Sequence, residues 1–233
     1  MKKIAGRVSA VQVLPRLPGA LRIAGASVAA VLLAVAAGCS TTPSARPVLV
    51  SIPALAATAP ATPAASSSAA PLLVVRRVTI PEYIESRRVR YRAEASTLQE
   101  WPNTYWAERI EIGVSREFAA ALRSKLPGWS VCSANCGDTP PRATVQVDLA
   151  PLDFERGARR LAARARITVT LPSAGAASTS APGSTTAVPA PRVREFSYQV
   201  AASADTPQAH AQAIAEALSQ LAGDVVPMLG ATP

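Results

Sequence analysis

The sequence predicts an α+β domain in which an antiparallel sheet of about five strands carries two long helices on one face. Three observations support this class. Several stretches alternate apolar and polar residues with the two-residue period of a strand. Two other stretches repeat apolar residues at the spacing of an amphipathic helix. The links between most strands are short, which favours antiparallel neighbours.

Two strands open the domain, which we expect to span residues 72–233 in the order ββαβββα. A β-rich run over 73–80 stops at Pro81. Over 88–92, arginines alternate with valine and tyrosine, the pattern of a short half-buried strand.

A helix follows these strands. From Trp106 onward, apolar residues recur every four positions, which predicts a helix over 104–126. Its N-cap would be Asn103 or Thr104, and Pro127 would end it.

Three strands and a second helix complete the order. Alternating residues predict the strands over 144–149, 163–171 and 192–200. In the second of these, Arg164 and Arg166 point away from the core. Thr206 and Pro207, a capping residue followed by proline, open the last helix, whose apolar stripe includes Ile214.

Residues 1–38 have the composition of an export signal. Five basic and no acidic residues accompany an apolar run over 23–37. That run of about 15 residues is shorter than the ~20 that a membrane-spanning helix needs. The segment ends in Val35-Ala36-Ala37-Gly38-Cys39.

This ending resembles the lipobox of bacterial lipoproteins, with Ala36 where leucine is usual. The resemblance implies that Cys39 receives a diacylglyceryl group and, after cleavage, a further acyl chain such as palmitate. Such acylation gives stable membrane anchoring. Ser40 in place of aspartate implies sorting to the outer membrane, by resemblance to enterobacterial lipoproteins. The alternative is an ordinary signal peptide with a chance cysteine.

The signal accounts for much of the basic character of the chain. The 24 basic and 15 acidic residues give a formal net charge of +9. Without residues 1–38, which hold five of those basic residues, 19 basic and 15 acidic ones remain and the charge is +4. Export and this modest charge argue against a nucleic-acid partner. Three cysteines are too few for a disulfide-dense miniprotein.

Two segments of low complexity flank or interrupt the predicted domain. Residues 39–71 are rich in proline, alanine and serine and carry one charge, at Arg46, so we expect a disordered tether. Residues 173–191 have no charge and separate two predicted strands, so we expect a mobile loop.

The sequence offers little for catalysis. Its single histidine, His210, lies on the last predicted helix, and we expect it to be partly exposed. One histidine without an acid or cysteine cluster cannot build an ordinary zinc site. A papain-like triad of Cys132, His210 and Asn135 is an alternative, but the local sequence around the cysteine does not match. We therefore predict no enzyme activity, no metal and no cofactor.

Cys132 and Cys136 form an even pair if Cys39 is lipidated. In an oxidising periplasm such close cysteines favour a structural disulfide. Free thiols and a redox function are the alternatives, although the spacing is not that of the two-residue redox motif.

A basic cluster lies between residues 76 and 92. It could face anionic lipid head groups or an acidic partner surface. The alternative is a solvated polar face of two strands. Its members are Arg76, Arg77, Arg87, Arg88, Arg90 and Arg92.

Four residues mark a family resemblance: Pro81 and Tyr83 after the first strand, and Trp106 and Glu108 at Tyr105-Trp106-Ala107-Glu108. With the intervening arginine-rich strand and the lipobox, they resemble the PqiC/YmbA-type, or ABC-type transport auxiliary lipoprotein component, family. The resemblance covers roughly residues 72–230. It implies that Pro81, Tyr83 and Trp106 shape the fold.

The resemblance also implies a function. Such a protein would be an outer-membrane-anchored, periplasm-facing, non-catalytic auxiliary subunit of an MCE-type or ABC-linked system that moves lipids between membranes and supports membrane integrity. Its partners would be an MCE-type tunnel protein, the inner-membrane transporter subunits and further copies of itself. The alternatives are a structural or assembly lipoprotein of the envelope and a periplasmic enzyme.

Overall fold

The computed structural model describes residues 45–54, 70–172 and 190–230. The predicted signal peptide, Cys39, residues 55–69 of the predicted tether and most of the predicted mobile loop lie outside these ranges. The described part is one compact unit with its own core.

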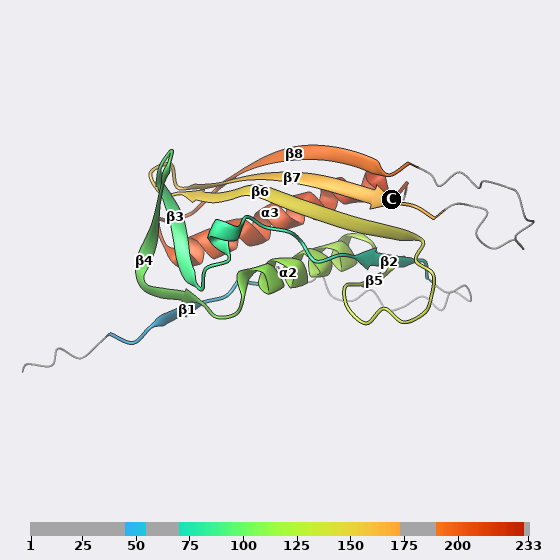
Figure 1. Cartoon of the computed structure of the whole chain (residues 1–233), viewed down its shortest axis with the longest axis horizontal. Coiled ribbons are helices and arrows are strands. Elements are labelled where there is room, and N and C mark those ends of the chain that lie inside the picture. The colour runs from blue at the N-terminus through green and yellow to red at the C-terminus, as the bar shows by residue number, and fades with distance from the viewer. Residues whose placement is uncertain (1–44, 55–69, 173–189, 231–233) are drawn as a thin grey trace, which may run out of the picture. The chain divides into compact units, whose positions relative to one another are not determined.

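Eight strands of the described residues form one sheet (Figure 1). The strands are β1 (Val48–Val50), β2 (Leu72–Val75), β3 (Arg88–Glu94), β4 (Thr97–Trp106), β5 (Ser130–Cys132), β6 (Ala143–Glu155), β7 (Arg160–Thr170) and β8 (Arg192–Ala201). The helices are the 3-10 turn η1 (Glu82–Ile84), α2 (Ile110–Lys125) and α3 (Pro207–Met228). The α+β class is confirmed, with more strands than the five or so that were predicted.

The sheet is mixed rather than purely antiparallel. β6, β7 and β8 form a long antiparallel meander, and β3 and β4 form an antiparallel hairpin. β2 runs parallel to both β5 and β6, and β1 runs parallel to β4. Periodicity predicts strands one at a time, so it could not reveal these pairings between distant segments.

The predicted start of the first helix is wrong. β4 runs to Trp106, and α2 begins only at Ile110, with Arg109 as its N-cap. Trp106 is four positions before Ile110 and apolar, so it mimics one more turn of the helical stripe. It is instead a strand residue that packs into the core, 2% exposed. Asn103, proposed as a cap, lies inside β4 with a left-handed φ of 50°.

The predicted disordered tether is wrong for residues 45–54. Val48–Val50 form β1 and pair with Thr104–Trp106 of β4. Val50 and Ile52 are each only 4% exposed. This strand has three residues and depends on a partner more than 50 positions away, so local composition could not predict it.

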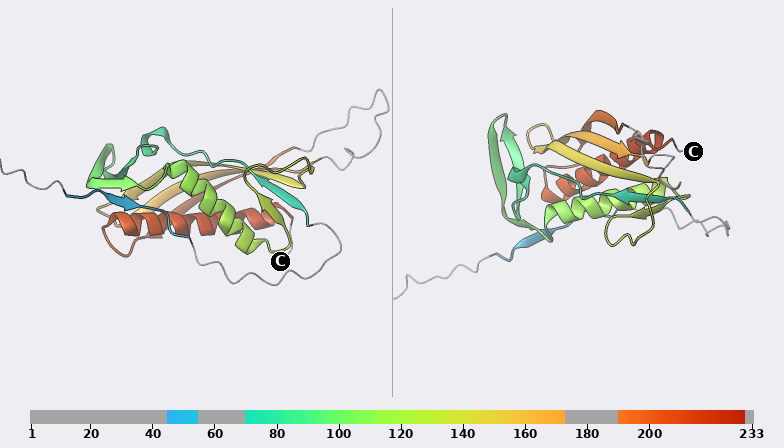
Figure 2. Two further views of the ribbon diagram at one scale, coloured as in Figure 1. Left: turned by 90° about the horizontal axis from the view of Figure 1, so that it is seen from below. Right: turned by 45° about the vertical axis from the view of Figure 1, so that its right-hand side comes forward.

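Both helices lie on one face of the sheet and pack against each other (Figure 2). α3 contacts β7 and β8 on that face, and Thr206 caps it as predicted, its hydroxyl accepting from the amide of Ala209. Alanines make up much of the buried part of α3, which lets the neighbouring elements approach closely. Neither α2 nor α3 is long and apolar enough to cross a membrane.

Candidate functional site

Pro81 and Tyr83 form a turn that is fastened to the sheet. The hydroxyl of Tyr83 donates to Oδ1 of Asp153 on β6 at 3.0 Å. Nε of Arg92, on β3, donates to the other carboxylate oxygen at 2.8 Å. Burial, together with the negative charge of Asp153, raises the pKa of Tyr83, so this hydroxyl remains a hydrogen-bond donor. The turn therefore joins η1, β3 and β6.

Trp106 and Glu108 also have partners within the domain. Trp106 lies in the core, its ring centroid 5.6 Å from that of His210. Glu108 forms an ion pair with Arg116 of α2. The motif residues of the two segments thus support the packing of separate parts of the fold.

His210 is buried, 3% exposed, so the prediction of partial exposure is wrong. Its ring centroid lies 4.8 Å from that of Phe154 and 5.6 Å from that of Trp101. Desolvation lowers the pKa of His210 to about 3, so the ring is neutral at physiological pH. Within the described residues its Nδ1 has no hydrogen-bond partner. The helical position alone could not reveal that the β3–β4 hairpin covers this ring.

Cys132 and Cys136 are joined by a disulfide just after β5. The bond occupies the sulfur that the alternative triad with His210 and Asn135 would use as its nucleophile. The pair instead closes a short surface turn.

The basic cluster is divided in the structure. Arg88 and Arg90 both pair with Glu100 across the β3–β4 hairpin, at 3.4 and 3.2 Å. Arg92 pairs with Asp153. These three guanidinium groups therefore have carboxylate partners inside the domain. Arg87 lines a small hollow together with Glu85 and Glu108.

Arg76 lies near the opposite end of β6. Its amide donates to the carbonyl of Val145, whereas Arg92 is in register with Glu155. Val145 and Glu155 are ten residue steps apart on β6, which corresponds to roughly 30 Å. Arg76 and the hairpin arginines do not form one patch.

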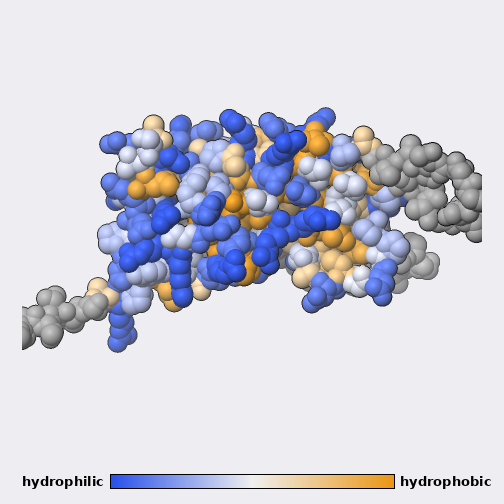
Figure 3. All heavy atoms as spheres, in the orientation of Figure 1, coloured by the Kyte–Doolittle hydropathy of each residue, from blue (hydrophilic) through white to orange (hydrophobic). Residues whose placement is uncertain are grey.

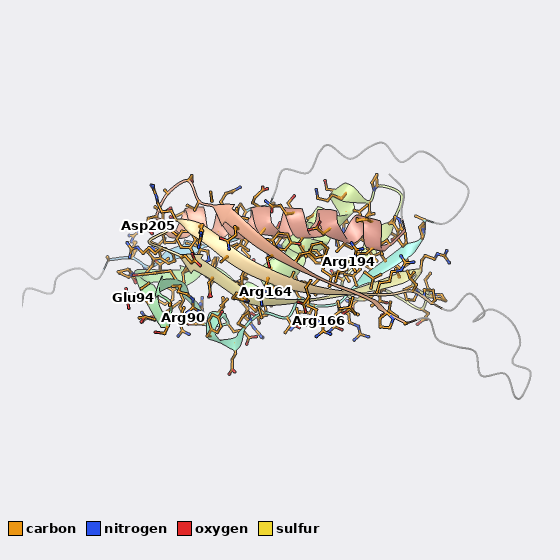
Figure 4. The ribbon with its side chains drawn as sticks, turned by 90° about the horizontal axis from the view of Figure 1, so that it is seen from above. Arg90, Glu94, Arg164, Arg166, Arg194 and Asp205 are labelled. Atoms are coloured by element: carbon orange, nitrogen blue, oxygen red, sulfur yellow. A yellow bond between two sulfur atoms is a disulfide. The ribbon has the colours of Figure 1, made fainter. Side chains whose placement is uncertain are left out.

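Arg76 belongs instead to the face of the sheet that the helices leave uncovered, which we call the open face. There it lines a shallow groove of about 330 Å³ with Thr144, Gln146, Thr168 and Thr170. Arg166 and Arg164 are the next outward residues of β7 and are exposed, as predicted (Figure 4). Within residues 45–54, 70–172 and 190–230 neither forms an ion pair.

Two acidic residues offset part of the positive charge of the open face. Asp148 of β6 and Glu195 of β8 stand opposite Arg166 in the strand registers. The face is therefore polar, with a modest excess of positive charge. The alternation of residues in β7 predicted that Arg164 and Arg166 point away from the core. It could not predict that they lie near the groove of Arg76, because that depends on the parallel pairing of β2 with β6. Polar side chains also cover much of the surface in Figure 3.

A hollow of about 480 Å³ lies between the β3–β4 hairpin and the β6–β7 turn. Its polar groups bind one another. Arg156 pairs with Asp205 at 2.7 Å and donates to the hydroxyl of Tyr91 at 2.8 Å. That hydroxyl donates to Gln99 at 2.7 Å. These contacts link the hairpin to the segment before α3.

One solved structure shares this fold, and a second shows a weaker similarity. A crystal structure of an uncharacterized protein has a TM-score of 0.59 at 16% identity, covering 79% of this chain and 99% of that one. Protein XCC0632 from Xanthomonas campestris has a TM-score of 0.45 at 19% identity, covering 70% and 86%. No functionally curated protein shows significant similarity to the sequence.

A family model gives the decisive match. The model of the ABC-type transport auxiliary lipoprotein component matches residues 54–226, well over half of the chain. The matched range includes the Tyr83 turn, α2, all but the last two residues of α3, and all strands except β1. The chain therefore belongs to the ABC-type transport auxiliary lipoprotein component family.

Proposed function

We propose that the protein is a non-catalytic auxiliary subunit of an MCE-type or ABC-linked system that moves lipids between the inner and outer membranes. Cys39 would anchor it in the outer membrane, with the domain facing the periplasm. The observation that carries the proposal is the family match over residues 54–226, since that family is named for ABC-type transport. The MCE partner and the lipid cargo rest on the sequence resemblance.

The side-chain arrangement supports a docking role. Tyr83, Asp153 and Arg92 bind one another, and His210 is enclosed by aromatic rings. These polar groups serve the fold. The open face presents exposed arginines and short hydroxyl side chains that suit an acidic surface of a partner subunit.

The partner is tested by capture from membranes. The full chain, tagged at its C-terminus, is extracted with mild detergent, and the captured proteins are identified by mass spectrometry. We expect MCE-type and inner-membrane transporter subunits. Capture of an outer-membrane barrel or peptidoglycan-bound proteins in their place would contradict the proposal and favour a structural or assembly role.

The anchor and its membrane are tested separately. Cys39→Ala should release the protein from the membrane fraction, and retention there would contradict lipid anchoring. Density-gradient fractionation should place the wild-type protein in the outer membrane. Ser40→Asp should shift it to the inner membrane if the sorting rule applies, and wild-type protein in the inner-membrane fraction would refute the assigned location.

A further inference from the structure

The folded domain begins very close to Cys39 in the sequence. Five residues separate Cys39 from Ala45, where the described structure begins. Nδ2 of Asn103 donates to the carbonyls of Ala45 and Arg46, at 2.6 and 2.9 Å. These bonds fix the start of the domain against β4. A fully extended chain between Cys39 and Ala45 spans only about 20 Å.

β1 exposes apolar side chains at this place. Leu49 is 58% exposed and Val48 is 44% exposed. They are two of only four large apolar residues that the described part of the chain leaves exposed, and they are adjacent. β1 pairs with β4 on one side and is the last strand at that end of the sheet.

Aromatic and basic groups accompany these side chains. Tyr105 of β4 is the register partner of Leu49. The guanidinium of Arg88 lies 5.4 Å from the centroid of the Tyr105 ring, and it also pairs with Glu100. Arg46, just before β1, is exposed. Apolar side chains beside an aromatic ring and cations are typical of a protein surface that rests at the interface of a bilayer.

We propose that β1 and the adjoining part of β4 lie against the membrane that holds Cys39. The occupant is the lipid bilayer: Leu49, on the same side of the strand pair as Tyr105, enters the head-group boundary, and Arg46 faces lipid phosphates. The proposal rests on the lipid anchor of the proposed function. In place of a domain at the end of a tether over residues 39–71, it gives a domain held at the membrane surface.

The test uses the acylated full-length mature protein in vesicles of phosphatidylethanolamine and phosphatidylglycerol. A nitroxide is attached at Leu49→Cys and, in a matched variant, at Val193→Cys. Val193 is 45% exposed on β8, at another edge of the sheet. Cys132 and Cys136 are bonded to each other and Cys39 is acylated, so each variant offers one free thiol.

Electron paramagnetic resonance then compares the collision rates of each label with oxygen, which enters lipid, and with a water-soluble nickel complex. We expect the oxygen-to-nickel ratio to be several-fold higher at position 49 than at position 193. Equal ratios at positions 49 and 193 in acylated, vesicle-bound protein would overturn the inference alone.

The intact mass of the mature protein separates this failure from that of the proposed function. A mass that lacks the acyl chains on Cys39 would overturn both the anchor and the membrane contact of β1. If the mass shows the acyl chains but the nitroxide at position 49 is exposed to water, the lipid anchor is supported and only the membrane contact of β1 is refuted.

Discussion

The hydroxyl of Tyr83 donates a 3.0 Å hydrogen bond to Asp153, 70 positions further along the chain. Asp153 is 9% exposed and also accepts from Arg92. The guanidinium of Arg92 lies 5.8 Å from the centroid of the Tyr83 ring, which adds a cation–π contact. The buried carboxylate of Asp153 thus connects the turn of Pro81 and Tyr83 to strands β3 and β6.

Tyr83→Phe should lower the free energy of unfolding by about 1 kcal/mol, because it removes one hydrogen bond and leaves Asp153 paired with Arg92. Asp153→Ala should cost about 3 kcal/mol, because both donors lose their acceptor. Urea unfolding measures both. Tyr105→Phe is the control, since the Tyr105 hydroxyl donates no hydrogen bond within the described residues. Equal effects at Tyr83 and Tyr105 would contradict the role of the Asp153 contact.

The disulfide between Cys132 and Cys136 closes a loop with only three intervening residues. Its loss should lower the free energy of unfolding by less than the ~3 kcal/mol expected for a 15-residue loop, because short loops lose little entropy on closure. The double variant Cys132→Ser and Cys136→Ser should therefore stay folded, as followed by circular dichroism and urea unfolding. Global unfolding of this variant would show that the turn matters more than its size suggests.

Elements with a regular pattern over many residues could be predicted from the sequence. Burial alternates along β7, and along β6 as far as Leu149, because one face meets the helices and the other meets solvent. The last helix carries a capping threonine and proline at its start. Periodicity and helix caps are local properties of the sequence, so they can be recognised without knowledge of the tertiary contacts.

The predictions from the sequence are wrong where contacts between distant segments determine the structure. β4 contains Pro102 and a left-handed Asn103, which break its alternation and hide the strand. β1 depends wholly on β4. Similarly, the arginines of the basic cluster appear adjacent in the sequence, but carboxylates from β4 and β6 pair with three of them. Sequence proximity therefore overstated the charge available to a partner.

His210 should make stability depend on pH. Its folded-state pKa is about 3, well below the ordinary value of 6.5, so between these values only the unfolded chain binds the proton. The stability associated with the neutral ring is fully present above pH 6.5. It falls by about 1.4 kcal/mol per pH unit as the pH drops, and levels off near pH 3.

His210→Phe keeps an aromatic ring beside Phe154 and Trp101 and removes this titration. The stability difference between wild type and variant should therefore change by about 2 kcal/mol between pH 7 and pH 5, in favour of the variant at low pH. Urea unfolding at both pH values measures it. Because other titrating groups are common to both proteins, parallel stability curves would contradict the burial of a neutral histidine.

Arg164 and Arg166 should contribute to partner binding without supporting the fold. Both are exposed on the open face and form no ion pair within the described ranges, so the double variant Arg164→Gln and Arg166→Gln should change stability by less than about 1 kcal/mol. If an acidic partner surface meets this face, removing two charges should weaken binding of the captured transporter subunit by about tenfold at low salt. The loss should shrink at high salt, where exposed charges are screened.

The matched control for the open face removes two charges elsewhere. Arg123 and Lys125 are exposed in the last turn of α2, on the helical side of the sheet. The variant Arg123→Gln and Lys125→Gln has the same net charge as the open-face variant, so any general electrostatic effect appears in both. Surface plasmon resonance with the purified subunit compares the two affinities. Equal affinities of the two variants would exclude the open face as the docking surface, whereas weakening confined to Arg164 and Arg166 would assign the partner to it.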